Sequence, residues 1–305
     1  MGKSDPMPLG GVALLAVVTI FWGVNWPYMK IVVSEIPVWW FRTFCLWFAA
    51  GGMLLAAKLS GSRATVTRAE VWPLILLSVF AVLGWHLFSG YGISLMPAGR
   101  ASTLAFTMPV WAAMLSVWLL DERLSAAKLI GLALGLAGIA VLLGPDLIAF
   151  QTAPWGALLM IGAAMSWAAG TVLIKRYTWK SSSLTLVGWQ QLIGAPVITA
   201  GALIIDPMPD WATVSPEAWG SLAFVLLLPI LFCQWAYFRV VQMLPATTAA
   251  IGTLAIPVVG SISGAVILDE ALGPREISAL VLICSALASV MILPNLRRKA
   301  PAGAG

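Results

Sequence analysis

Two polar side chains stand within long apolar stretches of the sequence. His86, the single histidine, lies in GWHLFSGYG, and Gln234, which matches it after a shift of 148 along the chain, lies in FCQWAYFR. A polar group inside hydrocarbon is costly without a partner, so both are candidates for binding a solute. The alternative is that each forms a hydrogen bond within helix packing. Ser89 of the first stretch and Trp235 and Phe238 of the second are counted with the same candidate site.

A second group of candidates lies near the N-terminus, in WGVNWP. Trp22, Asn25 and Trp26 have the spacing i, i+3 and i+4, which places them on one face of a helix. Gly23 and Pro27 weaken the helix here, because proline leaves a backbone carbonyl without its donor. These features favour a binding site. The alternative for Asn25 is a hydrogen bond to a neighbouring helix.

Aromatic residues form a third group, because the chain has 16 tryptophans. Trp167 matches Trp22 after a shift of 145 and shares a helix face with Thr171. An indole N–H buried in the middle of a membrane needs an acceptor, so some tryptophans are expected to border a polar cavity. Aromatic walls suit flat, apolar or cationic solutes. The alternative is that these rings pack against lipid or other helices.

Paired prolines mark two similar stretches, LMPAGRASTLAFTMPV and MLPATTAAIGTLAIPV. Pro97 and Pro245 are expected at helix starts, where proline is tolerated. Pro109 and Pro257 fall inside the expected helices, where a missing hydrogen bond predicts a kink that can act as a hinge. The remaining candidate site residues lie close to these two prolines: Thr107, Met108, Trp111 and Thr253.

The elements that position these residues follow from composition. With 61% hydrophobic and 10% charged residues and a mean hydropathy of +0.97, the chain is predicted to be an integral membrane protein. A bilayer core takes roughly 20 helical residues. Ten apolar runs of about that length predict an all-α protein with ten transmembrane helices: 9–33, 37–58, 70–91, 97–120, 127–144, 154–177, 183–205, 218–241, 245–268 and 274–294.

The distribution of basic residues predicts the orientation. With a cytoplasmic N-terminus, thirteen of the 17 Lys and Arg residues fall in segments that face the cytoplasm. This bias agrees with the positive-inside rule. We therefore expect a multi-pass protein of the cell inner membrane, with both termini and the tail 295–305 in the cytoplasm. The net charge of +5 then reflects topology, and no nucleic acid is expected as a partner.

The chain contains an internal repeat. A shift of 148 gives nine identities over the thirty positions 95–124, among them Asp121 and Glu122 on Asp269 and Glu270. The repeat predicts two units of five helices, 9–144 and 154–294. Because five is odd, the second unit starts from the opposite side of the membrane and is inverted. Inverted repeats around a central cavity are typical of secondary transporters that work by alternating access.

These motifs also carry a family resemblance. WGVNWP, the run from PAGRASTLAFTMPVW to LLDERL and the glycine-rich GLALGLAG recur in both halves and resemble the EamA branch of the drug/metabolite transporter superfamily. The resemblance covers nearly the whole chain. It implies ten helices in two EamA repeats and the export or exchange of small metabolites, with amino acids as one substrate class. We expect aromatic and other neutral amino acids; the alternative is other metabolites or cationic drugs.

Other classes fit the sequence less well. A membrane enzyme needs a nucleophile with its base, paired acids or a metal cluster, and one histidine without an intramembrane acid supplies none of these. No cofactor and no metal site are expected. A channel is expected to show a ring of polar residues or a filter loop, which is missing.

Energy coupling, a further cation and the oligomeric state stay open in the sequence. All twelve acids lie at span ends or in loops, which favours downhill export or exchange over proton coupling through His86. Arg42 is a candidate counter-charge for a substrate carboxylate, but snorkelling to the interface is favoured. Gly131 and Gly135 permit close packing inside one protomer or between two, so we expect a monomer or a weak homodimer. The expected partners are a small-molecule substrate and membrane lipid.

Overall fold

The computed structural model describes residues 9–121, 126–149, 155–243 and 246–291. The tail 295–305, Glu122, and the side chains of Phe238 and Thr253 lie outside the described residues. All regular elements in this part of the chain are helical, as the sequence predicts. They are α1 (Leu9–Glu35), α2 (Val38–Leu59), α3 (Arg68–Ser78), η1 (Val79–Gly84), α4 (Trp85–Ser94), α5 (Ala98–Ala105), α6 (Met108–Leu119), α7 (Ala126–Ala149), α8 (Trp155–Arg176), α9 (Ser183–Ile205), α10 (Pro216–Val225), η2 (Leu226–Phe232), α11 (Cys233–Met243), α12 (Ala246–Leu268) and α13 (Pro274–Met291).

Most of these helices have the length and composition of membrane spans. Within the described ranges, seven qualify: Gly10–Glu35, Val38–Leu59, Arg68–Ser94, Ala98–Leu119, Trp155–Arg176, Ser183–Ile205 and Pro216–Tyr237. Two shorter apolar helical stretches are Leu129–Val141 and Ala255–Leu268. The protein is therefore an all-helical, multi-pass membrane protein.

Two of the spans contain a π-helical segment, which the sequence analysis did not predict. η1 joins α3 to α4, and η2 joins α10 to α11. Moved by the repeat shift of 148, η1 would cover 227–232, which lies within η2. Pro229 lies inside η2 and donates no backbone hydrogen bond, which is compatible with a wider turn. Single π-helical turns inside α-helices are common at functional sites.

The fourth predicted run is broken into two helices. α5 ends at Ala105 and α6 begins at Met108, and the turn between them is closed by the Thr107 hydroxyl, which donates to the Leu104 carbonyl at 2.7 Å. Pro109 thus lies in the first turn of α6, where its missing N–H costs little. The span is therefore interrupted directly before Pro109, whereas Pro257 lies inside a continuous helix, α12. The hinge role of the two prolines stays a prediction.

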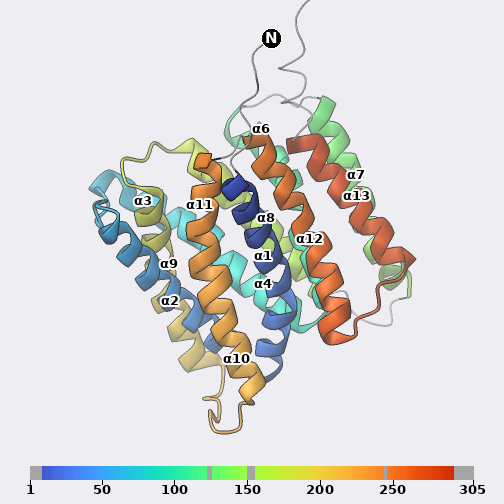
Figure 1. Cartoon of the computed structure of the whole chain (residues 1–305), viewed down its shortest axis with the longest axis horizontal. Helices are drawn as coiled ribbons and strands as arrows, with labels where there is room; N and C mark the ends of the chain where they lie inside the picture. Colours follow the sequence, from blue (N-terminus) through green and yellow to red (C-terminus); the bar gives the residue numbers. More distant parts are fainter. Residues whose placement is uncertain (1–8, 122–125, 150–154, 244–245, 292–305) are drawn as a thin grey trace, which may run out of the picture.

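Helices of the first half pack against helices of the second. α2 packs along α9, α7 along α13, α1 along α12 and α4 along α8. Figure 1 shows α7 and α13 side by side at one edge of the bundle, and α1 between α11 and α12. A close contact without room for a side chain occurs at Gly23 of α1, where a Cβ atom would lie 2.5 Å from Val259. Gly135 faces Val110 of the same chain, so its close packing lies inside one protomer.

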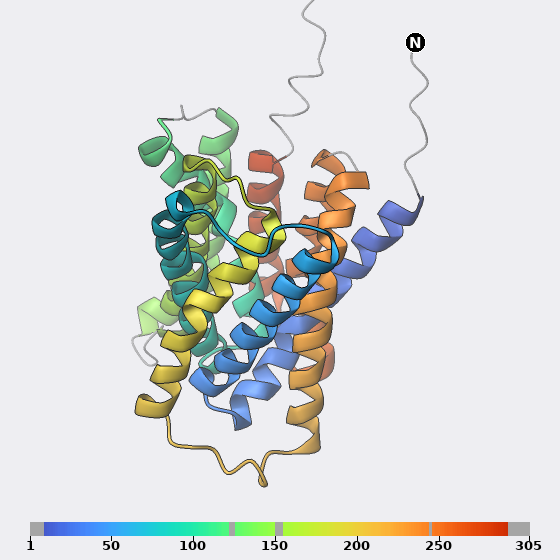
Figure 2. The same cartoon turned by 90° about the vertical axis from the view of Figure 1, so that its left-hand side faces the viewer.

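Polar contacts between the halves define one end of the bundle. The Glu35 carboxylate at the end of α1 accepts hydrogen bonds of 2.6 Å from both the backbone N–H and the hydroxyl of Ser215, which caps α10. Asp206, just after α9, accepts one of 3.2 Å from the Trp39 N–H in α2. We call this end the Glu35 face. Figure 2 shows it at the bottom, with the connection between α9 and α10 crossing below the helices.

A second polar cluster on the Glu35 face involves Glu270, which follows α12. Its carboxylate accepts hydrogen bonds from the N–H groups of Ala98 and Gly99, the first residues of α5, at 2.5 and 2.9 Å. Nearby, Arg100 of α5 forms a salt bridge of 2.6 Å with Glu276 of α13. The repeated Asp-Glu motif of the sequence therefore has a structural role here, because it caps a helix of the other half.

The opposite end of the bundle is the Glu70 face. Glu70, in the first turn of α3, accepts hydrogen bonds of 2.7 and 2.9 Å from the N–H groups of Lys180 and Ser181 in the connection between α8 and α9. At the end of α8, Arg176 donates to the Leu119 carbonyl at the end of α6. α1 thus ends at the Glu35 face and α8, its repeat equivalent, at the Glu70 face.

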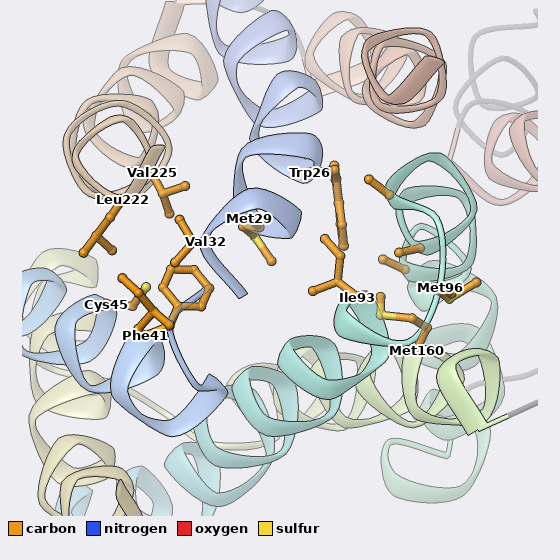
Figure 3. Close-up of a cluster of buried hydrophobic side chains, with 14 of the residues drawn as sticks. Trp26, Met29, Val32, Phe41, Cys45, Ile93, Met96, Met160, Leu222 and Val225 are labelled. Atoms are coloured by element: carbon orange, nitrogen blue, oxygen red, sulfur yellow. The ribbon is translucent and has the colours of Figure 1, made fainter. Parts of the chain in front are cut away.

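The buried core is shared by both halves. Figure 3 shows Phe41 and Cys45 of α2 close to Leu222 and Val225 of α10. On the other side of α1, Met160 of α8 belongs to the same cluster as residues of α4 and α5. A core continuous across both halves holds them as one unit, and several of its residues line the site described next.

Candidate functional site

A cavity of about 830 Å³ lies between the two halves of the chain. Cavities that bind small molecules typically have volumes of roughly 300–1,000 Å³. Nine of the residues predicted from the sequence line it: Trp22, Asn25, Trp26, His86, Met108, Pro109, Trp167, Thr171 and Gln234. The structure therefore brings together the central members of the predicted set, including the repeat equivalents His86 and Gln234.

Other predicted residues do not line the cavity. Ser89 and Thr107 are fully buried beside it, and Trp111 donates to the Thr107 hydroxyl at 3.1 Å. Trp235 is about half exposed and packs against Phe232, which places it on the outside of the bundle. Pro257 is buried in α12 away from the cavity wall. For Trp235 the alternative interpretation therefore holds, in which the ring lies on the outside of the bundle and does not border the cavity.

Two aromatic pairs cross between the halves in the cavity wall. Trp22 of α1 lies 5.2 Å from Tyr237 of α11, and Trp85 of α4 lies 5.1 Å from Trp167 of α8, measured between ring centroids. The Trp22 indole N–H donates to the Pro229 carbonyl in η2 at 3.2 Å. The π-helical segment thus supplies the acceptor that a buried indole needs. Trp22 and Trp167, which the repeat shift of 145 relates in the sequence, each belong to one of the two pairs.

Three lining residues carry buried polar atoms that have no hydrogen-bond partner in the described part of the chain. They are Asn25 Oδ1, His86 Nδ1 and Gln191 Oε1. The amide nitrogen of Asn25 donates to the Met29 sulfur at 3.1 Å, which fixes the side chain. Buried polar groups are nearly always paired, so these atoms need a solute or water.

The position of Arg42 differs from the sequence prediction. The sequence favours a side chain that snorkels to the membrane interface, but Arg42 is only 3% exposed and lines the cavity. Its Nε donates to the His86 carbonyl at 3.0 Å and its Nη2 to the Ser89 hydroxyl at 2.9 Å. Gly90 makes room for α2 here, because a Cβ at this position would lie 2.5 Å from Val38 Cγ1 and 3.2 Å from the Arg42 Nε. The glycine after Ser89 was the available signal in the sequence.

The cavity extends from the middle of the bundle toward the Glu70 face. α8 contributes residues from its last three turns, ending with the exposed Lys175, and α9 contributes Val187 and Gln191 near its start. Both of these helix ends lie at the Glu70 face. None of the described residues that form the contacts of the Glu35 face lines the cavity. The Glu35 face is therefore the closed side.

Sequence reasoning missed several lining residues because they are apolar or lie outside any repeated motif. They include Met29, Cys45, Trp85, Phe106, Gln191, Pro229 and Tyr237. Trp85 directly precedes His86 in the chain, and Tyr237 lies one turn after Gln234. A search one helical turn around each predicted polar residue would have found both.

Comparison with known proteins identifies relatives along the whole chain. The profile of the EamA-like transporter family matches residues 9–144 and 154–292. An uncharacterized transporter YvbV of Bacillus subtilis is 30% identical over 296 residues, which cover 95% of this chain and 94% of that protein. A probable amino-acid metabolite efflux pump of Escherichia coli is 26% identical over 309 residues, with 94% of each chain covered.

A solved structure has a similar fold. A crystal structure superposes with a TM-score of 0.66 at 19% sequence identity and covers 93% of this chain and 98% of that chain. The likeness extends over both halves of the described structure. At this level of identity it concerns the fold alone.

Proposed function

The chain belongs to the EamA-like transporter family, and on this premise we propose that it exports or exchanges neutral amino acids, aromatic ones included, by alternating access. The observation that carries the proposal is the aromatic cavity between the two EamA repeats. Both repeats contribute to each aromatic pair, so movement of one repeat against the other would change the site. Relatives described as probable amino-acid metabolite efflux pumps support the substrate class.

The proposed architecture is ten transmembrane helices in two inverted repeats. α1 and α8 end at opposite faces, and the two π-helical segments and the two positive-φ residues Asp121 and Asp269 are related by the repeat shift. An axis in the membrane plane relates two such units. The repeat boundaries 9–144 and 154–294 are part of this proposal.

The proposed orientation places the Glu70 face in the cytoplasm. Arg63, Arg68, Arg176 and Lys180 lie on or beside this face, in agreement with the positive-inside rule. The cavity then opens toward the cytoplasm, where an exporter takes up its substrate. Both termini, including the tail 295–305, are cytoplasmic in this proposal, and the membrane is the inner membrane of the cell.

The proposed transport cycle needs no proton relay. No acidic side chain lines the cavity among the described residues, which favours facilitated export or exchange. Pro109, beside the break between α5 and α6, and Pro257 in α12 are the proposed hinge positions. Alternating access would require the contacts of the Glu35 face to open while the Glu70 face closes. Transport that persists in the absence of a pH gradient would agree with this cycle.

Exchange of amino acids by the purified protein tests the proposal. We expect proteoliposomes loaded with L-phenylalanine to accumulate labelled L-phenylalanine, with no requirement for a pH gradient. Trp167→Ala should reduce the exchange on the order of tenfold, because it removes one ring of an inter-repeat aromatic pair. The matched control is Trp155→Ala, at the exposed first position of the same helix. Exchange no greater than in protein-free liposomes, for all neutral amino acids, would refute the proposal.

A further inference from the structure

We infer that Arg42 is the carboxylate-binding residue of the cavity, so that the cavity selects solutes with a carboxylate and rejects organic cations that lack one. This inference rests on the proposed function, because it names the charge that a transported solute must carry. It also decides between the two substrate classes that the sequence left open, amino acids and cationic drugs.

The first argument is the free-energy cost of burying the positive charge of Arg42. Arg42 is almost fully buried, and an ionised side chain in a medium of low polarity is strongly disfavoured unless it is paired. Among the described residues, no acidic side chain pairs with it. Its neighbours are a carbonyl, a hydroxyl, the Cys45 thiol and the Phe41 ring, whose centroid lies 4.6 Å from the guanidinium carbon. The described residues around Arg42 therefore supply no negative charge that balances the charge of the guanidinium.

The second argument is orientation. The hydrogen bonds to the His86 carbonyl and the Ser89 hydroxyl hold the guanidinium from the side of α4. Held in this way, the guanidinium is pre-organised at the cavity wall, and a planar guanidinium matches a carboxylate with two parallel hydrogen bonds. A lysine at this position would lack that geometry.

The third argument is the composition of the wall. Its described cations are Arg42 and Lys175, and no described acidic residue lines it. The field in the cavity therefore favours anionic groups and opposes a solute whose only charge is positive. The unpaired oxygens Asn25 Oδ1 and Gln191 Oε1 can accept hydrogen bonds from an amino group that accompanies the carboxylate. A zwitterionic amino acid can pair its carboxylate with Arg42 and donate hydrogen bonds from its amino group to these oxygens.

Ligand-induced thermal stabilisation of the purified protein tests the inference without depending on transport, because a ligand that binds the folded state raises the apparent melting temperature. The probes are L-phenylalanine, 3-phenylpropionate, which lacks the amino group, and phenylethylamine, which lacks the carboxylate. We expect both carboxylates to stabilise the wild-type protein and phenylethylamine not to do so.

Variants at Arg42 sharpen the test. Arg42→Gln should weaken binding of L-phenylalanine roughly 10- to 100-fold, as expected for the loss of hydrogen bonds from a charged group. Removal of the positive charge should also allow phenylethylamine to stabilise the variant, a gain that a merely structural role would not produce. The matched control is Lys58→Gln, which removes an exposed cation from the last turn of the same helix and should bind L-phenylalanine like the wild type.

The outcomes separate the inference from the proposed function. Stabilisation by phenylethylamine equal to that by L-phenylalanine, or no stabilisation by either carboxylate, would overturn the inference. Stabilisation by 3-phenylpropionate without any response to amino acids would uphold the inference and refute amino-acid export. If Arg42→Gln fails to fold, the wild-type series alone decides.

Discussion

Replacing Gly23 with alanine is expected to destabilise the protein and abolish transport. Gly23 lies where α1 crosses α12, and an added Cβ would lie 2.5 Å from both Cβ and Cγ1 of Val259 and 3.1 Å from the Ile256 carbonyl oxygen. Valine is stiff at χ1 and its Cβ is fixed to the backbone, so relief requires the helices to separate. Overpacking of this kind costs about 1–3 kcal/mol or more. Separation here would also displace Trp22, the neighbouring residue in the cavity wall.

Thermal unfolding in detergent measures this effect, with exchange in proteoliposomes as the second readout. The matched control is Gly51→Ala in α2, where an added Cβ would meet nothing within 4 Å. There the same substitution should be neutral or stabilise by about 0.4–1 kcal/mol, because alanine reduces the freedom of the unfolded chain. Equal melting temperatures for the two variants would show that α1 and α12 do not pack as described.

Replacing Glu270 with alanine is expected to destabilise the protein by an amount comparable to that of the Gly23 substitution. Its carboxylate accepts from the N–H groups of Ala98 and Gly99, both buried at the start of α5. Without it, two buried donors at a helix N-terminus lose their partner and the helix dipole loses its anion, for a combined cost of about 2–4 kcal/mol. Because Glu270 belongs to the second repeat and α5 to the first, the loss should also loosen the closed Glu35 face.

The comparison is with Glu217→Ala, an exposed acid in the first turn of α10. It also stands at a helix N-terminus, but in contact with water, so its removal should lower the free energy of unfolding by less than about 1 kcal/mol. We expect the loss in free energy of unfolding for Glu270→Gln to lie between those of the two alanine variants, since an amide oxygen still accepts one hydrogen bond. A Glu270→Ala variant as stable as Glu217→Ala would contradict the capping role.

Periodicity and repetition made much of the fold predictable. The apolar runs fix the helices because a membrane leaves the backbone no other partner than itself. The matching of Trp22 with Trp167 and of His86 with Gln234 predicts that the four residues share one site, and all four line the cavity. The prediction succeeded because each of the two repeats contributes residues from the middle of its spans to the cavity between them.

The remaining features depend on tertiary contacts that no local pattern encodes. The buried side chain of Arg42 donates its hydrogen bonds to Ser89 and to the His86 carbonyl, which lie on a different helix. η1 has no proline, so nothing in its sequence distinguishes it from an ordinary helical turn. Trp235 was placed in the site by its neighbour Gln234, although successive helical residues point about 100° apart and its ring faces outward.

Substrate protection of a single cysteine tests the central claim, that the cavity between the two repeats is where the solute binds. Thr171 lines the cavity and its side chain is exposed, so Thr171→Cys, in a protein whose three native cysteines are replaced by alanine, should react with a maleimide. Saturating L-phenylalanine should slow that reaction several-fold, while a cysteine at the exposed Thr213, in the connection before α10, reacts at an unchanged rate. Active exchange of L-phenylalanine with no protection at position 171 would contradict the account.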